Sequence, residues 1–556
     1  MEFLDKILIS DADFSSLLKA IEKERLPLCC TGLSGVHKAV VLASLSRLLK
    51  RKITVITEDE ATANELCSDA KALGLNAVNF PLRDYCIGNL SGYSKEYEHK
   101  RTDTLSALAD GAFELLVLSI DAAVQYTIPP EVLRKARFEI KVGETIEISD
   151  LCEKMLSAGY TRSEICEGKG QFSIRGGIFD IFPIREKNPV RIEFWGDEID
   201  SISFFDIETQ RRGESIDFIE ITPACEVIYN PHDLMEKLSA LTSQKGLSEN
   251  QKAKIENDIN ALENGISILA DRYIPLIYQG LETVFDYISD TLIVLSESGN
   301  ISDRLNNMEI QQSADIEIFL EEGFLNGKTA KLYLSKSELL SLVNNSVILE
   351  NFPRGSYLLK VKDIINFNFK RSSCWSGDIN VLLEDIEYIH SNKGTVVILA
   401  GEQKAAKVLS NTLEEKGINA VFASSANEIS RGVTVMTGGL SSGFEIPSAR
   451  FLLITHRYIA SEGKRKNKRP KNAKEIGSLD ELKRGDYVVH TAHGIGIFDG
   501  INRITNAGVT KDYIKIKYAK SDVLYVPVTQ LDLVSRYIGA ATEDGAVKIH
   551  RLGGSE

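Results

Sequence analysis

The sequence GLSGVHKA at residues 32–39 lies between an apolar run at residues 26–30 and a helical pattern at residues 38–50. A glycine-containing turn between a buried strand and a helix is typical of α/β domains in which the turn holds a phosphate. The alternation of strand and helix patterns then continues at residues 53–57, 60–73, 77–80 and 115–119. Residues 1–129 are therefore predicted to form a parallel sheet with crossover helices.

Two segments follow that interrupt and then complete this domain. Residues 130–225 contain short β-type runs separated by Gly, Asn and Asp, which predicts a strand-rich inserted domain. Residues 226–305 return to helical patterns at 248–271, with Ser248 as the N-cap, and at 277–289. They end in an apolar strand at 291–295 that is expected to rejoin the first sheet, so the first domain is predicted to be discontinuous.

The rest of the chain divides into three further parts. Residues 340–456 predict a second α/β domain, a spacer without an assigned chemical role, in which 438–448 is expected to be a loop. Residues 457–479 are expected to be a basic linker, since seven of the eleven residues 464–474 are Lys or Arg. Five short β-type runs within 480–545 predict an SH3-like or Tudor-like β-barrel.

The loop at 32–39 departs from a working phosphate-binding loop of the form GxxxxGK[ST]. His37 stands where a glycine lets the backbone approach phosphate, and Ala39 replaces the hydroxyl that binds magnesium. The candidate acidic strand ends in Ser296-Glu297, with Ser296 in place of an aspartate. The predicted fold is thus a degenerate RecA-like NTPase domain, whose former nucleotide site comprises Gly32, Gly35, His37, Lys38, Ala39, Ser296 and Glu297.

Composition restricts the possible functions. The eight cysteines have no CxxC spacing, which argues against a disulfide framework and a zinc site. The net charge of −14 indicates that any contact with nucleic acid is local. No apolar stretch approaches the roughly 20 residues of a membrane span, and the N-terminus has no signal-peptide pattern. We expect a cytoplasmic protein with no membrane association, no cofactor and no metal.

The most specific motifs are GYTR at 159–162, GQFSIRGGIFDIFP at 170–183 and RIEFWGDEID at 191–200. These stretches resemble the module shared by the excision-repair protein UvrB and bacterial transcription-repair coupling factors, through which both recruit UvrA. FDIETQR at 205–211, PLRDY at 81–85 and YEHKR at 97–101 extend the likeness. The resemblance implies that the insert binds UvrA through Arg162, Arg175 and Phe179. Phe179 also alternates with Ile178 and Ile181, so a place in the core remains open.

A second resemblance distinguishes these two relatives. RGDYVVHTAHGIG at 484–496 and LYVPV at 524–528 are similar to the RNA polymerase-interacting domain of coupling factors and to CarD-type regulators. UvrB has no such domain, and its nucleotide loop is intact. The chain is therefore identified as resembling the N-terminal half of a coupling factor, with a UvrB-like first domain.

The resemblance implies a scaffold for transcription-coupled repair that binds RNA polymerase and recruits UvrA. In the family a RecG-like, ATP-driven DNA translocase follows and makes the main DNA contacts, so this chain is expected to be a fragment, or a protein without a motor, and no enzyme. A UvrB-type helicase and a CarD-like regulator remain the alternatives.

The polymerase β subunit is expected to pair with an open strand edge of the barrel, at Asn502, Arg503, Ile504 and Thr505. Ile504 is an apolar residue in a polar stretch, so it is predicted either to contact polymerase or to point into the barrel core. The basic run at 464–474 could likewise be a solvated linker or touch DNA.

Overall fold

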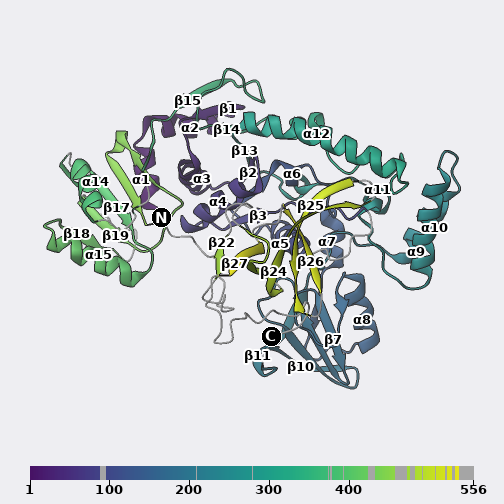
Figure 1. Cartoon of the computed structure of the whole chain (residues 1–556). Coiled ribbons are helices and arrows are strands. Elements are labelled where there is room, and N and C mark those ends of the chain that lie inside the picture. Colours follow the sequence, from purple (N-terminus) through teal and green to yellow (C-terminus); the bar gives the residue numbers. More distant parts are fainter. Residues whose placement is uncertain are drawn as a thin grey trace.

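The computed structural model describes residues 1–87, 95–207, 209–278, 280–372, 375, 379–391, 394–423, 432–456, 473–475, 482–490, 493–506, 509–519, 522–528 and 533–537. The first domain lies at the centre of the molecule (Figure 1). Among the described residues, no helix is both long and apolar enough to cross a membrane.

The first domain is built on a parallel sheet of seven strands in the order β15-β1-β14-β13-β2-β4-β3. The strands are β1 (Leu28–Thr31), β2 (Ile53–Thr57), β3 (Ala77–Phe80), β4 (Leu115–Ser119), β13 (Leu292–Ser296), β14 (Val347–Leu349) and β15 (Asp363–Asn366). Every residue of β1, β2 and β4 is buried, which explains their continuous apolar sequences. β13 pairs with β2, so the prediction that this strand rejoins the first sheet is confirmed.

Helices pack on both faces of this sheet. They include α1 (Phe3–Ile9), α2 (Ala12–Glu22), α3 (Gly35–Leu49), α4 (Glu60–Ala72), α5 (Glu96–Ala109), α6 (Ile120–Ala123), α7 (Pro130–Ala136), α12 (Ser298–Glu321) and α13 (Lys336–Leu342). The predicted helix at 277–289 is wrong. Among the described residues of this stretch, the chain forms only the last residue of α11 (Ile274–Ile277), which follows the turn η1 (Asp271–Tyr273), and the short turn η2 (Val284–Tyr287). Gly280, a poor helix former, lies between α11 and η2, and the apolar side chains pack into the core of the first domain.

The predicted boundary of the second α/β domain at residue 340 is also wrong. β14 and β15 both pair with β1, which places residues 347–366 in the first sheet. A three-residue apolar strand contains no signal for its partner, since pairing is decided by contacts far away along the chain.

The insert forms an antiparallel-rich sheet of six strands, in the order β11-β10-β9-β8-β7-β6, below the first domain (Figure 1). Its elements are β5 (Phe138–Lys141), α8 (Ile148–Ser157), β6 (Thr161–Arg162), β7 (Gln171–Arg175), β8 (Ile178–Phe182), β9 (Val190–Trp195), β10 (Glu198–Phe205), β11 (Arg212–Ile216) and β12 (Phe218–Ile221). β5 pairs with β12, and α8 packs on one face of the large sheet. Helix α7, expected in the insert, instead packs into the first domain through Leu133.

A helical hairpin of α9 (Pro231–Thr242) and α10 (Glu249–Glu263) projects at the right of Figure 1. The Ser248 hydroxyl accepts a hydrogen bond from the Gln251 amide, and the Gln251 side chain accepts one from the Ser248 amide. This capping box confirms Ser248 as the predicted N-cap, although the helix is shorter than expected.

The second α/β domain has a six-stranded sheet in the order β16-β20-β21-β17-β19-β18. Its elements are β16 (Lys370–Ser372), α14 (Ile379–Ser391), β17 (Thr395–Leu399), α15 (Gln403–Glu415), β18 (Ala420–Phe422), β19 (Gly432–Met436), β20 (Gly443–Ile446), η4 (Pro447–Ala449) and β21 (Phe451–Thr455). The expected loop at 438–448 contains β20. Phe444 of this strand and Phe451 join the core of the first domain, so the two domains share one apolar cluster.

The C-terminal sheet is antiparallel, with six strands in the order β22-β27-β23-β24-β25-β26. They are β22 (Ala473–Glu475), β23 (Tyr487–His490), β24 (Gly494–Asn506), β25 (Val509–Lys517), β26 (Val523–Pro527) and β27 (Val534–Tyr537). β22 lies in the segment expected to be only a linker, and it pairs with β27. Where a closed barrel was expected, the described parts of β22 and β26 do not pair with each other.

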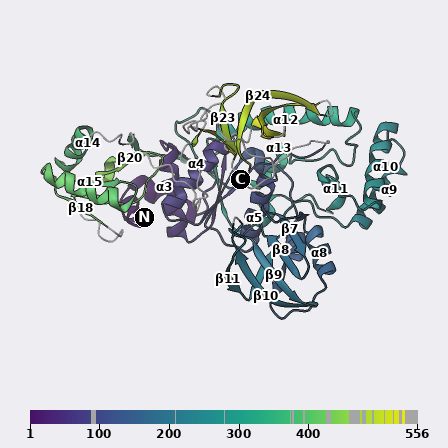
Figure 2. The ribbon, with the colours of Figure 1, turned by 60° about the horizontal axis from the view of Figure 1, so that its bottom comes forward.

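The modules project in different directions. Figure 2 shows the insert below the first domain and the C-terminal sheet above it, with the second α/β domain at the left. A partner of the insert and a partner of the C-terminal sheet would therefore approach the molecule from different sides.

Candidate functional site

The former phosphate loop is short and its backbone is already bonded. β1 ends at Thr31 and α3 begins only four residues later, at Gly35. The Gly32 amide donates to the Asn351 carbonyl at 3.2 Å, and the Leu33 amide donates to the Glu350 carbonyl at 3.1 Å. Gly32 has a φ of +82°, and a Cβ there would lie 2.1 Å from the Phe367 carbonyl oxygen. The amides that would cradle a phosphate thus hold this loop against residues 350–367.

His37 completes this closure. The His37 Nδ1 accepts a hydrogen bond from the Ser34 amide at 3.2 Å, which caps α3. Its ring is 2% exposed and meets the rings of Phe369 and Phe444 edge-on, at 5.6 and 6.0 Å between centroids. Burial lowers the pKa of His37 to about 4, so the imidazole is neutral at pH 7. The side chain that blocks the loop is therefore also part of the contact between the two α/β domains.

Lys38 binds the chain's own second motif. Its Nζ donates to Glu297 Oε1 at 2.7 Å and to Ser296 Oγ at 2.9 Å, and its side chain is only 6% exposed. Burial opposes ionisation of Glu297, but Lys38 beside it holds the pKa of that carboxyl below its usual range. Ala39 is fully buried in the core. The structure therefore brings the predicted residues of the former site together, but as an internal ion pair where a nucleotide would bind.

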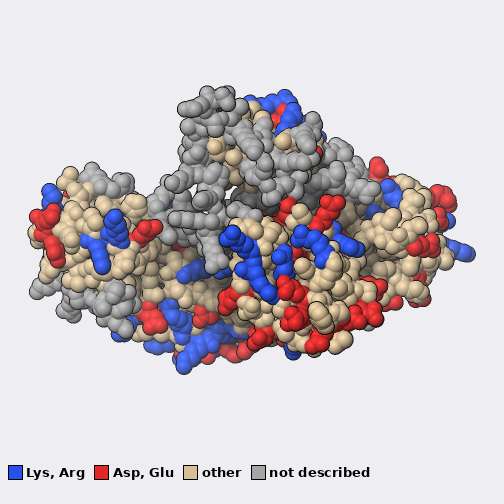
Figure 3. All heavy atoms as spheres, turned by 90° about the horizontal axis from the view of Figure 1, so that it is seen from below, with Lys and Arg blue, Asp and Glu red and all other residues tan. Residues whose placement is uncertain are grey.

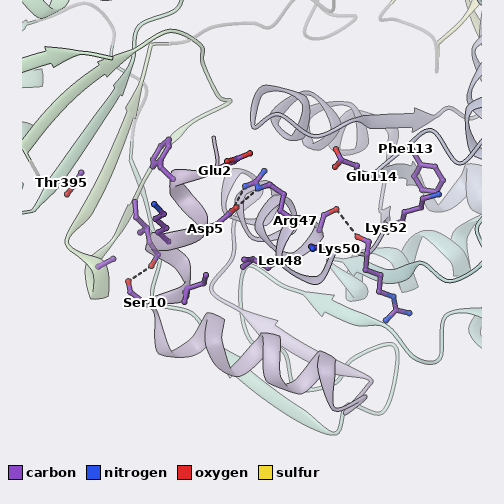
Figure 4. A pocket seen from close by; sticks show the side chains of 17 residues that line it. Glu2, Asp5, Ser10, Arg47, Leu48, Lys50, Lys52, Phe113, Glu114 and Thr395 are labelled. Carbon is purple, nitrogen blue, oxygen red and sulfur yellow. Dashed lines mark hydrogen bonds and ion pairs between the residues drawn. The ribbon is translucent and has the colours of Figure 1, made fainter. Parts of the chain in front are cut away.

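An open cavity of about 1550 Å³ lies at the other end of α3 (Figure 4). It is bordered by α1, by the end of α3 and by Thr395 of the second α/β domain. Arg47 and Asp5 point toward each other in this cavity and form two hydrogen bonds, at 2.7 and 2.8 Å. A helix of 15 residues separates this cavity from the former loop, a distance on the order of 20 Å, so it is no part of a nucleotide site.

Two of the three residues predicted to contact UvrA are exposed on the insert. Arg162, on edge strand β6, is exposed. Arg175 ends β7, is 48% exposed and donates to buried Asp180 at 3.0 Å. Arg162 is aligned with Phe172, three residues before Arg175, so the two arginines are separated by on the order of 10 Å along the strand.

The expected contact by Phe179 is wrong for this conformation. The Phe179 ring is completely buried and stacks on Phe172, with 5.3 Å between centroids and 2° between the ring planes. Asp180, its neighbour on the opposite face, binds Arg191 through two hydrogen bonds at 2.8 and 2.9 Å. Strand alternation directs Phe179 into the core and Asp180 toward the arginines. Figure 3, seen from the side of the insert, shows cations and carboxylates interspersed.

The motifs at 81–85 and 97–101 form a buried ionic hub at the base of the insert, although sequence reasoning gave them no role. Arg101 is fully buried and binds Glu226, the residue at which the chain leaves the insert. Arg83 binds Glu98 at 3.1 Å and Asp271 at 2.7 Å. Burial raises the pKa of Glu226, but Arg101 and Arg83 outweigh this effect and hold it below its usual range. These five charged residues lie between positions 83 and 271, and nothing in the sequence indicated that they are close together.

Helix α5 also touches the start of the GQF motif. A Cβ at Gly170, which has a φ of +76°, would lie 2.8 Å from His99 Nε2 on this helix. Burial lowers the pKa of His99 to about 4. Further along α5, Asp110 binds Arg137 at 2.6 Å and Arg185 at 3.2 Å. Helix α5 is thus the support on which the insert rests.

The predicted polymerase-binding strand is the distal half of β24. Asn502, Arg503, Ile504 and Thr505 pair with β25 on one side. The pairing of β24 with β23 stops at Ile497, and Phe498 still exchanges backbone hydrogen bonds with Gly485 and Asp486, so no described strand covers the other side of residues 499–506. Asn502 is half-buried and Arg503 is exposed. The side chains of Ile504 and Thr505 lie outside the described residues, so whether Ile504 faces the core stays a prediction.

Two family models match the modules at either end of this fold. Residues 138–226 match the UvrB interaction domain, in agreement with the observed limits of the insert. Residues 482–538 match the CarD-like/TRCF RID domain, which corresponds to the C-terminal sheet from just before β23 to the end of β27. The fold and these matches define a multidomain α/β protein with an interaction module at each of two places.

Comparison with whole proteins identifies the chain more closely. It is 31% identical over 576 residues to the transcription-repair-coupling factor of Bacillus subtilis (strain 168), with all of this chain and 49% of the relative covered. It is 29% identical to those of Staphylococcus aureus (strain MRSA252) and Staphylococcus haemolyticus (strain JCSC1435), with 95% of this chain and 46% of each relative covered. The chain is a homologue of the N-terminal half of transcription-repair-coupling factors, and it spans about half their length.

Proposed function

We propose that this chain is a recruitment scaffold for transcription-coupled DNA repair. The insert binds UvrA, and the C-terminal sheet binds the β subunit of RNA polymerase. The observation that carries this proposal is that a UvrB interaction domain and a CarD-like/TRCF RID domain occur on one chain, on different sides of a common core.

The geometry of the insert suits a protein partner. Arg175 is half-exposed and its carboxylate partner, Asp180, also serves Arg191, so the guanidinium keeps free donors toward solvent. Arg162 adds a second exposed cation at the edge of the same sheet. Arginines of this kind are common anchors of protein interfaces.

The C-terminal sheet suits a strand partner. Beyond Phe498 one side of β24 has no described neighbouring strand, which leaves backbone donors and acceptors for an added strand. Backbone pairing gives affinity, and side chains such as Arg503 and Ile504 would provide specificity.

The former nucleotide site supports a scaffold in preference to a UvrB-type helicase. Lys38 is held by Ser296 and Glu297, and the loop amides bond to residues 350 and 351. We expect no ATP turnover by this chain. ATP-driven translocation on DNA, and with it displacement of polymerase, would belong to the half of the relatives that this chain does not span.

The decisive experiment measures binding of the chain to purified UvrA and to RNA polymerase core enzyme separately, by biolayer interferometry. We expect both to bind, and to bind simultaneously. Binding of polymerase alone would favour a CarD-like regulator, and ATP hydrolysis abolished by Lys38→Ala would favour a helicase.

An Ile504→Arg variant tests the strand proposed for polymerase. The expected result is loss of polymerase binding, with the melting temperature and the UvrA affinity unchanged. Arg134→Ala on α7, an exposed cation outside both modules, is the control. A folded Ile504→Arg variant that binds polymerase normally would exclude this strand, and a barrel that unfolds would assign Ile504 to the core.

A further inference from the structure

Three cations converge on one carboxylate of the C-terminal sheet, and this carboxylate lies on β24 three residues before the predicted polymerase-binding stretch. Asp499 on β24 contacts Arg484 at 2.8 Å, Lys517 at 2.9 Å and Lys515 at 3.1 Å. Arg484 lies in the turn before β23, and both lysines lie on β25. Hydrogen bonds from Lys517, Arg484 and Lys515 hold the pKa of Asp499 below its usual range. These four residues are called the Asp499 cluster below.

The Asp499 cluster carries excess positive charge at the surface. One carboxylate faces three cations, of which Arg484 is 74% exposed, Lys517 51% and Lys515 21%. Lys515 and Lys517 are two residues apart on one strand, so their side chains leave the same face of the sheet. In Figure 3, Lys and Arg atoms surround acidic ones at the top of the view, on the side where the C-terminal sheet lies.

The sequence around the Asp499 cluster is also net positive in charge. Residues 482–538 contain eight Lys or Arg and five Asp, whereas the whole chain has a net charge of −14. The run at 464–474, with seven cations, leads into β22. The region that bears the Asp499 cluster is thus net positive within an acidic chain.

We propose that the Asp499 cluster is a contact site for the sugar–phosphate backbone of duplex DNA. Phosphate oxygens take over donors of Arg484, Lys515 and Lys517, and Asp499 acts as the internal counter-ion that keeps these side chains together when DNA is absent. The proposed contacts are to phosphates, which carry no sequence information, so binding does not depend on base sequence. This inference rests on the proposed function in one respect, because docking on polymerase would bring the sheet beside the DNA that polymerase holds.

Duplex DNA suits the cluster better than an acidic protein segment does. The cations belong to two separate elements, the turn before β23 and strand β25, and all three are at least partly exposed around a single carboxylate, so the group is net positive and open to solvent. A long polyanion with regularly spaced charges engages such a group at many points and releases counter-ions as it does so. An acidic segment bound at this face would instead appear as loss of polymerase binding in the variants below.

The test uses the full chain, a fluorescent 30-base-pair duplex and no polymerase, with anisotropy measured from 50 to 200 mM KCl. The Arg484→Gln/Lys517→Gln variant is expected to bind DNA about 10-fold more weakly, with the slope of log K against log salt reduced by about 1 for each cation removed. Asp499→Asn is expected to bind several-fold more tightly, because it removes the competing carboxylate. Arg134→Gln, an exposed cation paired with a carboxylate on α7, is the control.

A DNA contact is expected to change DNA affinity in opposite directions in the two variants, whereas an ion cluster with a purely structural role is not. DNA affinity and salt slope unchanged in Arg484→Gln/Lys517→Gln would overturn the proposal, as would loss of polymerase binding with DNA binding intact. If Asp499→Asn lowers the melting temperature, the DNA affinity of Arg484→Gln/Lys517→Gln is used alone to test the proposal. Failure of the chain to bind polymerase would leave this measurement unaffected, so the two proposals fail separately.

Discussion

The former nucleotide loop and the outer face of the insert hold their cations in opposite ways. Lys38 is 6% exposed, with Glu297 and Ser296 as partners supplied by the same domain. Arg175 is 48% exposed, and it shares Asp180 with Arg191. The first cation has no free donor directed to solvent, whereas the second keeps several.

The difference teaches how a binding site becomes a structural element. An inherited lysine in a cradle of free amides binds phosphate, but the same lysine beside an ionised glutamate stabilises the fold. In this chain the amides of Gly32 and Leu33 are also consumed, by carbonyls of residues 351 and 350. Whether such a site can bind a ligand depends on which of its hydrogen-bonding groups are not already bonded within the chain.

Breaking the internal ion pair should have the largest effect. Glu297→Gln leaves Lys38 buried without a carboxylate and is expected to lower the free energy of unfolding by about 3 kcal/mol, as measured by urea denaturation. The double variant Lys38→Met/Glu297→Gln should recover most of this loss. Glu139→Gln, which breaks the exposed pair with Lys141, is the matched control and should have a much smaller effect on the free energy of unfolding. A Glu297→Gln variant that is as stable as this control would contradict the comparison.

Removing the exposed cation should affect binding and leave stability unchanged. Arg175→Ala is expected to weaken UvrA binding about 30-fold, since truncating a charged interface group costs roughly 2–5 kcal/mol. Its melting temperature should stay within about 1 °C of wild type, because the lost ion pair is half-exposed. Lys141→Ala, an exposed cation of the insert paired with Glu139, serves as the control. Equal affinities for Arg175→Ala and Lys141→Ala would place the UvrA contact elsewhere.

The buried imidazole should make the joint between the α/β domains sensitive to acid. The pKa of His37 is about 4 in the folded chain and near 6.5 when unfolded, so the unfolded state binds more protons between these values. Stability from this residue is present above about pH 6.5 and is lost as the pH falls toward 4. Between pH 7 and pH 5 the loss should be about 2 kcal/mol.

His37→Gln isolates this contribution, because it removes the titrating group and retains polar atoms near Ser34. The measurement is the difference in unfolding free energy between wild type and His37→Gln at pH 7 and at pH 5. Other buried histidines, such as His99, titrate equally in both proteins and cancel. A difference that does not change with pH would show that His37 is already protonated or exposed in the folded chain.

Sequence reasoning predicted the local elements well where the pattern was long and regular. β2 (Ile53–Thr57) and β4 (Leu115–Ser119) were predicted to the residue, and the Ser248 cap was found from its hydroxyl and the helix after it. The sequence did not predict that β14 and β15 belong to the first sheet or that β20 is a strand, and these strands are only three or four residues long. A strand of this length is stabilised by its neighbours in the sheet, and those neighbours lie up to hundreds of residues away.

The sequence by itself determined that residues 32–39 and 296–297 lack groups of a working phosphate-binding site. His37, Ala39 and Ser296 remove the groups that approach phosphate and organise magnesium, whatever the fold around them. It also determined the two interaction modules, because their motifs are local and specific to a family. Only the tertiary structure decided what replaced the lost chemistry and which side chains the modules present. Lys38 meets Glu297, Arg101 meets Glu226 and Phe179 turns inward, since burial and pairing depend on residues brought together by folding over more than a hundred positions.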